Sequence, residues 1–368
     1  MKKNNTRTQN PRGRKTVPQS ITMGIDLGDK TSRWCALIDG EVREGTVATN
    51  RKAIVALFGE LPRCRVAIEV GAHSRWVDRL FRDLGHEVYV ANARQVKLIT
   101  ESSRKDDRLD AQTLARLARA DPQLLRPVRH RSDEAQQVLT VIRVRAALVE
   151  VRTALVNSAR GLAKSFGERL PKCDADQMSP ERARALPERL RETLRPLLEQ
   201  VAALTASIKD SDRNIEQIAR TEYPETELLM QVSGVGNLIA LTFLLTLEDH
   251  ARFAHSRDVG CYVGLRPQRS ESGARQPQLG ITKEGDVYLR KMLVQSAHWI
   301  LSRRGPDTDL KRWGLKLAER GGKNAKKRAL VAVARKLGIL LHRLWVTAEV
   351  YDPLRNSRAR EMQRAAAA

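Results

Sequence analysis

Hydrophobic and polar positions divide the chain into a mixed first part and an almost wholly helical second part. Short apolar runs predict strands over residues 21–28, 33–38, 41–49, 64–70 and 87–91. Helical spacing predicts helices over residues 51–60, 73–84 and 108–119. Three consecutive strands followed by alternating helices and strands are expected of an RNase H-like α/β fold, whereas a Rossmann fold opens with strand, helix, strand.

From Ser132 onward the periodicity becomes helical. Ser132 is a candidate N-cap, and apolar residues then recur at spacings of three, four and seven up to residue 220, interrupted between Pro171 and Pro187. This pattern predicts an antiparallel helical hairpin or coiled coil, long enough to dimerise or to span between domains. Further on, the pattern predicts a helix, turn and helix over 228–247, a loop-rich region over 253–291, helices over 290–301 and 326–346, and a frayed tail over 353–368.

These elements suggest five segments. They are a basic disordered arm (1–20), an RNase H-like domain (21–130), a helical hairpin or coiled coil (131–222), a mostly α C-terminal domain (223–350) and a tail (351–368).

Charge narrows the class of protein. The 368 residues include 66 Lys and Arg against 43 Asp and Glu, a formal net charge of +23, and such a surface usually faces nucleic acid. An anionic membrane is the alternative, but no long basic amphipathic anchor is visible and no apolar run approaches the ~20 residues of a membrane span. The four cysteines form no CxxC pair, which argues against a disulfide scaffold or a cysteine zinc site. We therefore expect a cytoplasmic protein without a membrane partner.

Carboxylates stand at positions where the pattern alone would not place them. Asp26 interrupts the first apolar strand, and Glu69 ends the fourth. Asp107 and Asp110 are three residues apart and so share one helix face. Four such acids repel one another unless divalent cations fill the cluster, and hard oxygen ligands suit Mg²⁺ or Mn²⁺. Taken alone, the helix acids Asp106, Asp107 and Asp110 are better explained as first-turn charges favoured by the helix dipole, whereas Asp26 in an apolar strand is less easily explained in that way. The ordered set of acids on the predicted fold favours the metal site.

A second candidate site lies in the loop-rich region. Ser270-Glu-Ser272-Gly273 is surrounded by cations that could hold a phosphate and neutralise developing charge. No histidine or aspartate base stands at a fixed spacing, so the spacing alone supports a serine nucleophile only weakly. The candidate nucleic-acid contacts are Arg266, Arg269, Arg275, Lys283, Arg290 and Lys291, together with Lys326, Lys327 and Arg328 in a second basic cluster, for which a solvated face is the alternative.

At these motifs the sequence resembles the DEDD-type insertion-sequence transposases of the IS110 group. The first motif set is Gly24-Ile-Asp26-Leu-Gly, Ala67-Ile-Glu69 and Lys105-Asp-Asp107-Arg-Leu-Asp110-Ala. The second is Gly264-Leu-Arg-Pro267, Ser272-Gly273, Ile281-Thr-Lys-Glu-Gly285 and Leu289-Arg290. The resemblance covers roughly residues 21–345 in the family's order.

The resemblance implies a Holliday-junction-resolvase-like metal domain and a C-terminal serine that attacks DNA. It assigns metal binding to Asp26, Glu69, Asp107 and Asp110 and the nucleophile to Ser272. Asp106 could replace Asp107, but the Asp-x-x-Asp-Ala spacing favours Asp107; likewise the Ser-Gly pair favours Ser272 over Ser270. It also implies donor and target DNA, a structured non-coding guide RNA, and a dimer or tetramer near the nucleoid. The alternatives are a Holliday-junction-type metal nuclease or nucleic-acid-binding protein without serine chemistry, and an inactive, decayed transposase.

Overall fold

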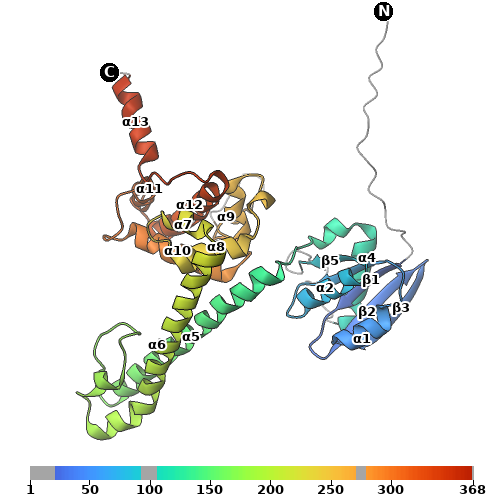
Figure 1. Ribbon diagram of the computed structural model, residues 1–368, viewed down its shortest axis with the longest axis horizontal. Coiled ribbons are helices and arrows are strands. Elements are labelled where there is room, and N and C mark those ends of the chain that lie inside the picture. The colour runs from blue at the N-terminus through green and yellow to red at the C-terminus, as the bar shows by residue number, and fades with distance from the viewer. Residues whose placement is uncertain (1–20, 93–105, 271–278, 367–368) are drawn as a thin grey trace, which may run out of the picture. The chain divides into compact units, whose positions relative to one another are not determined.

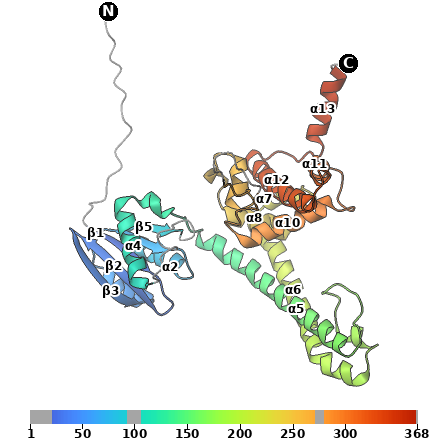
Figure 2. The same ribbon diagram turned by 180° about the vertical axis from the view of Figure 1, so that it is seen from behind.

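The computed structural model describes residues 21–92, 106–270 and 279–366. The chain forms two compact units, residues 1–130 and 131–368 (Figures 1 and 2). The helical region that begins at Arg131 and the C-terminal region after residue 222 therefore belong to one unit.

A mixed five-stranded sheet forms the centre of the first unit, in the order β3-β2-β1-β4-β5. Its strands are β1 (Ile21–Asp26), β2 (Thr31–Ile38), β3 (Glu41–Ala48), β4 (Arg65–Glu69) and β5 (Glu87–Ala91). The first three form an antiparallel meander, and β4 and β5 run parallel to β1. The helices α1 (Arg51–Phe58) and α2 (Ser74–Asp83) make the two crossovers. The predicted order of elements in this unit is confirmed.

The two faces of the sheet are filled by side chains of different size. On one face, Met23, Ile25 and Ile68 pack with Phe58 of α1 and Phe81 of α2. The other face carries small residues and receives α4 (Asp107–Ala120), the green helix that lies in front of the sheet in Figure 2. The residues at this second contact are Gly24, Cys35, Ala67 and Ala91 on the sheet and Ala111, Ala115 and Ala118 on the helix.

Gly24 marks the closest approach of the two layers. A Cβ atom added there would lie 2.1 Å from the carbonyl oxygen of Ala111 and 2.4 Å from the amide nitrogen of Ala115. Both are backbone atoms, so the helix itself would have to move. The absence of a side chain at Gly24 thus sets the depth at which α4 lies on β1.

We expect Gly24→Ala to lower the free energy of unfolding by about 1–3 kcal/mol or more, because overpacking against backbone cannot be relieved by a rotamer change. Gly71→Ala is the matched control, since a Cβ there meets nothing within 4 Å. Denaturant melts of both variants would test this. Equal stability of the two variants would contradict the close-packing argument.

Two long helices, α5 (Asp133–Ser165) and α6 (Glu188–Glu222), open the second unit and run side by side in Figures 1 and 2. They are antiparallel: Arg145 binds Asp212 at 2.8 Å, and Arg152 donates to Thr205 at 3.2 Å. Ser132 caps α5 by accepting from the Ala135 amide at 3.2 Å, as predicted. The predicted antiparallel pair is present, whereas coiled-coil geometry stays a prediction.

The rest of the unit is a helical cluster around one apolar core that includes Phe243, Leu293 and Leu337. Its helices are α7 (Glu225–Met230), α8 (Asn237–Leu247), α9 (Val259–Tyr262), α10 (Val287–Leu301), α11 (Asp309–Ala318) and α12 (Ala325–Thr347). A last helix, α13 (Arg355–Ala366), follows this cluster in the chain and contributes no residue to its core. Within the described residues, no helix is both long and apolar enough to span a membrane.

Two helices depart from the prediction. The first, α11, was not expected, and the frayed tail expected over 353–368 contains α13. The carboxylate of Asp309 anchors the start of α13 by accepting from the Asn356 amide at 2.6 Å and the Ser357 hydroxyl at 2.5 Å. This tertiary cap explains why a polar segment is helical here.

Candidate active site

The sheet brings Asp26 and Glu69 to one edge. The pairing of β1 with β4 is parallel and reaches Ile25 and Ile68, so the next residue on each strand is one of the two acids. Side chains alternate along a strand. Because Ile25 and Ile68 point into the core below α1 and α2, Asp26 and Glu69 point to the face that α4 covers.

The first turn of α4 supplies two further carboxylates at this edge. Asp106 is the N-cap of the helix, and its side chain accepts from the Arg108 amide at 3.0 Å. Asp107 and Asp110 follow inside the first turn. The β3 residue Glu44 holds this end of the helix by accepting from the side chains of Arg108 and Gln112.

Asp26 interacts electrostatically with all three of the other acids. The pKa of its carboxyl is raised from the ordinary 3.8 to about 6, mostly by burial and then by the negative charges of Asp107, Glu69 and Asp110, in that order. Asp106 is not among these causes, which fits its local role as the helix cap. The four acids picked out by sequence therefore share one electrostatic environment.

The donor set suits a hard divalent cation, because four carboxylates offer only oxygen ligands and their mutual repulsion would be relieved by positive charge. The described ranges contain no group of three His, Cys, Asp or Glu side chains arranged to hold a metal ion. The acids are thus coupled through space without forming a closed ligand shell.

Metal-free Asp26→Asn protein should melt at a higher temperature than wild type at pH 7.5, because asparagine removes a charge that burial and three neighbours disfavour. The pKa of Asp26 is raised on folding, so its destabilising effect is absent below about pH 4 and grows as pH rises through about 6. Thermal melts between pH 3.5 and 8 should therefore show similar melting temperatures for the two proteins near pH 4 and a growing difference as the pH rises. Added Mg²⁺ should raise the melting temperature of wild type more than that of the variant. A gap that does not change with pH would count against the assignment.

The second candidate centre falls partly outside the described residues: Ser272 and Arg275 are not among them. The chain on both sides of that segment forms a two-stranded ribbon, here defined as residues 264–268 and 280–285. Pro267 and Ile281 form an antiparallel bridge, and the amide of Gln268 donates to the carbonyl of Gly280 at 2.8 Å. Ser270, the alternative serine, is exposed just beyond the ribbon.

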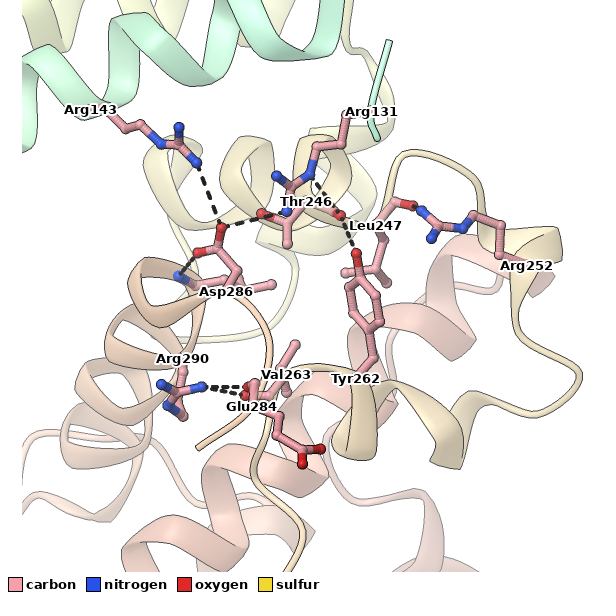
Figure 3. Close-up of polar contacts among 11 residues, drawn as sticks. Arg131, Arg143, Thr246, Leu247, Arg252, Tyr262, Val263, Glu284, Asp286 and Arg290 are labelled. Carbon is pink, nitrogen blue, oxygen red and sulfur yellow. Dashed lines mark hydrogen bonds and ion pairs between the residues drawn. The ribbon is translucent and has the colours of Figure 1, made fainter. Parts of the chain in front are cut away.

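The end of the ribbon is tied to α5. Asp286 caps α10 by accepting from the Leu289 amide at 2.9 Å through one carboxylate oxygen. Its other oxygen lies 3.5 Å from Arg131 and 4.0 Å from Arg143 (Figure 3). Arg131 also donates to the Thr246 carbonyl at 3.3 Å. Sequence analysis did not predict these ion pairs, because Arg131, Arg143 and Asp286 are far apart in the chain and give no local signal.

The candidate nucleic-acid contacts divide into two groups. One group is exposed and has no ion pair among the described residues; it consists of Arg266, Arg269, Lys283, Lys291, Lys326 and Lys327. Arg328 is also exposed. Arg290 differs, because it donates to two backbone carbonyls, those of Val263 and Glu284.

Most of the chain is similar to known proteins. A DEDD transposase model of the IS110 group, described as "Transposase", matches residues 23–167, and one described as "Transposase IS116/IS110/IS902 family" matches residues 226–312. The chain is 30% identical to the transposase for insertion sequence element IS1111A of Coxiella burnetii, with 92% of this chain and 93% of that protein covered. It is 30% identical to a probable family 20 transposase of Pseudomonas aeruginosa, over 82% of this chain and 90% of that protein. It is 27% identical to the transposase for insertion sequence element IS1328 of Yersinia enterocolitica, over 78% of this chain and 86% of that protein.

Proposed function

The chain belongs to the IS110 family of insertion-sequence transposases, and within that DNA-transposing activity we propose that a carboxylate metal site and a serine nucleophile divide the work of cutting and rejoining DNA. The DEDD domain implies an RNase H-like fold, and this family generally uses divalent metal. The observation that carries the proposal is the convergence of four acids on one sheet edge, seen in the raised pKa of Asp26.

Asp26, Glu69, Asp107 and Asp110 would hold Mg²⁺ or Mn²⁺ in this proposal. Such ions, when bound, neutralise charge on a phosphodiester and lower the pKa of a coordinated hydroxyl. The carboxylates themselves orient the ions, and the rigid contact of α4 with β1 at Gly24 keeps the helix acids level with the strand acids.

Ser272 would conserve the energy of the cut strand. Its Oγ forms a bond to phosphorus while the bond from phosphorus to the strand oxygen breaks, and the leaving strand ends as a hydroxyl that takes up a proton. A strand hydroxyl then attacks the phosphoserine and releases the serine, so rejoining needs no external energy source. Water as the nucleophile would instead leave free ends, as a junction nuclease does.

The exposed cations would bind phosphates of donor and target DNA and of a structured non-coding guide RNA. We further propose that the protein acts as a dimer or tetramer through the α5–α6 hairpin, in the cytoplasm at the nucleoid. Support for these partners is the net charge of +23 and the long hairpin.

Asp26→Asn and Glu69→Gln should each abolish metal-dependent strand transfer while leaving nucleic-acid binding close to wild type. Neutralising one acid removes a metal ligand but also relieves repulsion, so the fold should not suffer. Strand-transfer assays with Mg²⁺ or Mn²⁺, alongside binding titrations, test this. Asp106→Asn is the matched control, because Asp106 caps the helix and should retain activity. Full recombination by Asp26→Asn would refute the metal-site assignment.

Ser272→Ala should eliminate both covalent protein–DNA adducts on denaturing gels and all recombination, because it removes only the attacking oxygen. Ser270→Ala is the neighbouring control and should keep both activities. Adducts that persist in Ser272→Ala, or that never form in wild type under any metal condition, would rule out the serine mechanism and favour a metal nuclease that uses water.

A further inference from the structure

A pocket lies where the segment between α5 and α6 folds against the beginning of α6, at the light-green end of the hairpin in Figure 1. One wall is the 3₁₀ turn Pro180–Ala183 with Arg184 directly after it. The other wall is formed by α6 positions 191, 195, 198 and 199, which share one helix face. The cavity measures about 640 Å³, within the ~300–1,000 Å³ of small-molecule sites. It therefore has room for an organic ligand and not only for a single ion.

The deepest part of this pocket is apolar. Ala183 and Leu198 are 1% and 0% exposed and belong to the hydrophobic core of the hairpin. Both line the cavity, together with the half-buried ring of Pro180. A flat group that enters the pocket would thus lie against carbon atoms.

Three arginines give the pocket a positive rim. Arg191 lies 3.4 Å from Glu188 and 3.7 Å from Glu192, and Arg195 also pairs with Glu192. These ion pairs hold two guanidinium groups beside the cavity. Arg184 is exposed and forms no ion pair among the described residues, so its charge is available to a ligand.

Two carboxylates line the same pocket, and their surroundings differ. Glu181 accepts a hydrogen bond from the side chain of Ser179, which lowers the pKa of its carboxyl most, and the positive charge of Arg184 lowers it further. Glu199 is exposed and has neither a hydrogen bond nor an ion pair within the described ranges. Glu199 is thus the carboxylate with free acceptor oxygens at the cavity.

This combination of groups suits a nucleotide better than a bare anion. Two carboxylates would repel an inorganic phosphate, whereas a nucleotide can use every feature of the pocket. Its phosphate binds an arginine, its base stacks on apolar atoms and guanidinium planes, and the Watson–Crick edge of the base hydrogen-bonds to side chains. Guanine is the base whose edge presents two adjacent donors, N1–H and N2–H, to a single carboxylate.

We propose that this pocket binds an unpaired guanosine nucleotide of a single-stranded nucleic acid. Arg184 contacts the phosphate, Glu199 accepts from the base edge, and Arg191 and Arg195 form the wall on which the base stacks. The inference deepens the proposed nucleic-acid binding and rests on it for the source of the nucleotide.

Binding of short fluorescent oligouridine strands to the full-length protein tests the base contact. A strand with one central guanosine should bind about tenfold tighter than oligouridine or a strand with one central adenosine, the scale of one bidentate base contact. Glu199→Gln should reduce this preference below about twofold, because an amide offers one acceptor oxygen and opposes the second donor of guanine with a donor. Glu222→Gln, the same change at the other end of α6, is the matched control and should keep the preference.

The phosphate contact is tested by salt dependence. Arg184→Met should weaken binding of the guanosine strand and lower its log–log salt slope by ~0.7, the loss of one contact to a single strand. Arg182→Met is the matched control, because Arg182 is exposed on the same turn and does not line the pocket. Thermal melts of all four variants should match wild type, since each substituted side chain is exposed.

The same strands built on deoxyribose identify the source of the nucleotide. An equal guanosine preference would show that phosphate and base alone are recognised, in RNA and DNA alike. A preference confined to ribose strands would assign the pocket to RNA, and one confined to deoxyribose strands would assign it to DNA.

Three results would overturn the inference. They are the absence of a guanosine preference in wild type, a full preference in Glu199→Gln, or a change of oligomeric state in Arg184→Met with unchanged strand affinity, which would assign the pocket to a second copy of the chain. Failure of the proposed transposase chemistry is recognised separately, because these titrations involve neither metal nor strand transfer. Ser272→Ala should bind the guanosine strand as wild type does.

Discussion

The contact between α4 and β1 is the constraint on which the candidate metal site depends. Two acids come from strand ends and two from a helix that follows much later in the chain, so their convergence requires the helix to lie at a fixed depth and register on the sheet. Gly24 sets how closely the helix approaches the sheet, because a Cβ at this position would lie 2.1 Å from the carbonyl oxygen of Ala111. Glu44 provides the register by holding the first turn of the helix. The small side chains on the rest of that face have no reactive groups, yet their size determines whether the four acids come together.

The same contact explains why the acids carry an energetic cost. Placing Asp26 partly out of water beside three other carboxylates raises its pKa to about 6, so the ionised carboxylate costs folding free energy at neutral pH. A bound cation would lower that cost by neutralising part of the negative charge, which is the physical reason to regard the cluster as a candidate metal site. Lys283 and Lys326 of the second unit, which are exposed and form no ion pair within the described part of the chain, present the converse situation. Repulsion among such positive charges would be relieved by a polyanion such as DNA.

The order of the strands, and the four acids that interact electrostatically in the structure, could be predicted from the sequence for physical reasons that act locally. A carboxylate in an apolar strand, as at Asp26, conflicts with burial and therefore signals chemistry. Register in a parallel pair then brings Glu69 alongside. Asp106 and Asp107 were harder to tell apart, because both stand at the start of a helix. In the structure the side chain of Asp106 accepts a capping hydrogen bond from the Arg108 amide, which is a physical reason to prefer Asp107 as the fourth acid of the cluster. The helix α13 could not be predicted, because its first turn is capped by Asp309, the first residue of α11, which lies far from α13 in the sequence.

Arg290 shows why charge patterns predict partners poorly at the level of one residue. In the sequence it stands beside Lys291 and near Lys283, and all three read as phosphate contacts. Charge density tells how strongly a region attracts a polyanion, but it does not tell which side chains face outward. That depends on the backbone, here on two glycines that bring the carbonyls of Val263 and Glu284 within reach of one guanidinium. A lysine at an exposed helix position keeps its charge available to solvent or nucleic acid, whereas an arginine that donates to carbonyls stabilises the backbone around it. Adjacent positions on α10 thus place the same type of charge in opposite surroundings: Lys291 is exposed to solvent, and Arg290 donates to backbone carbonyls.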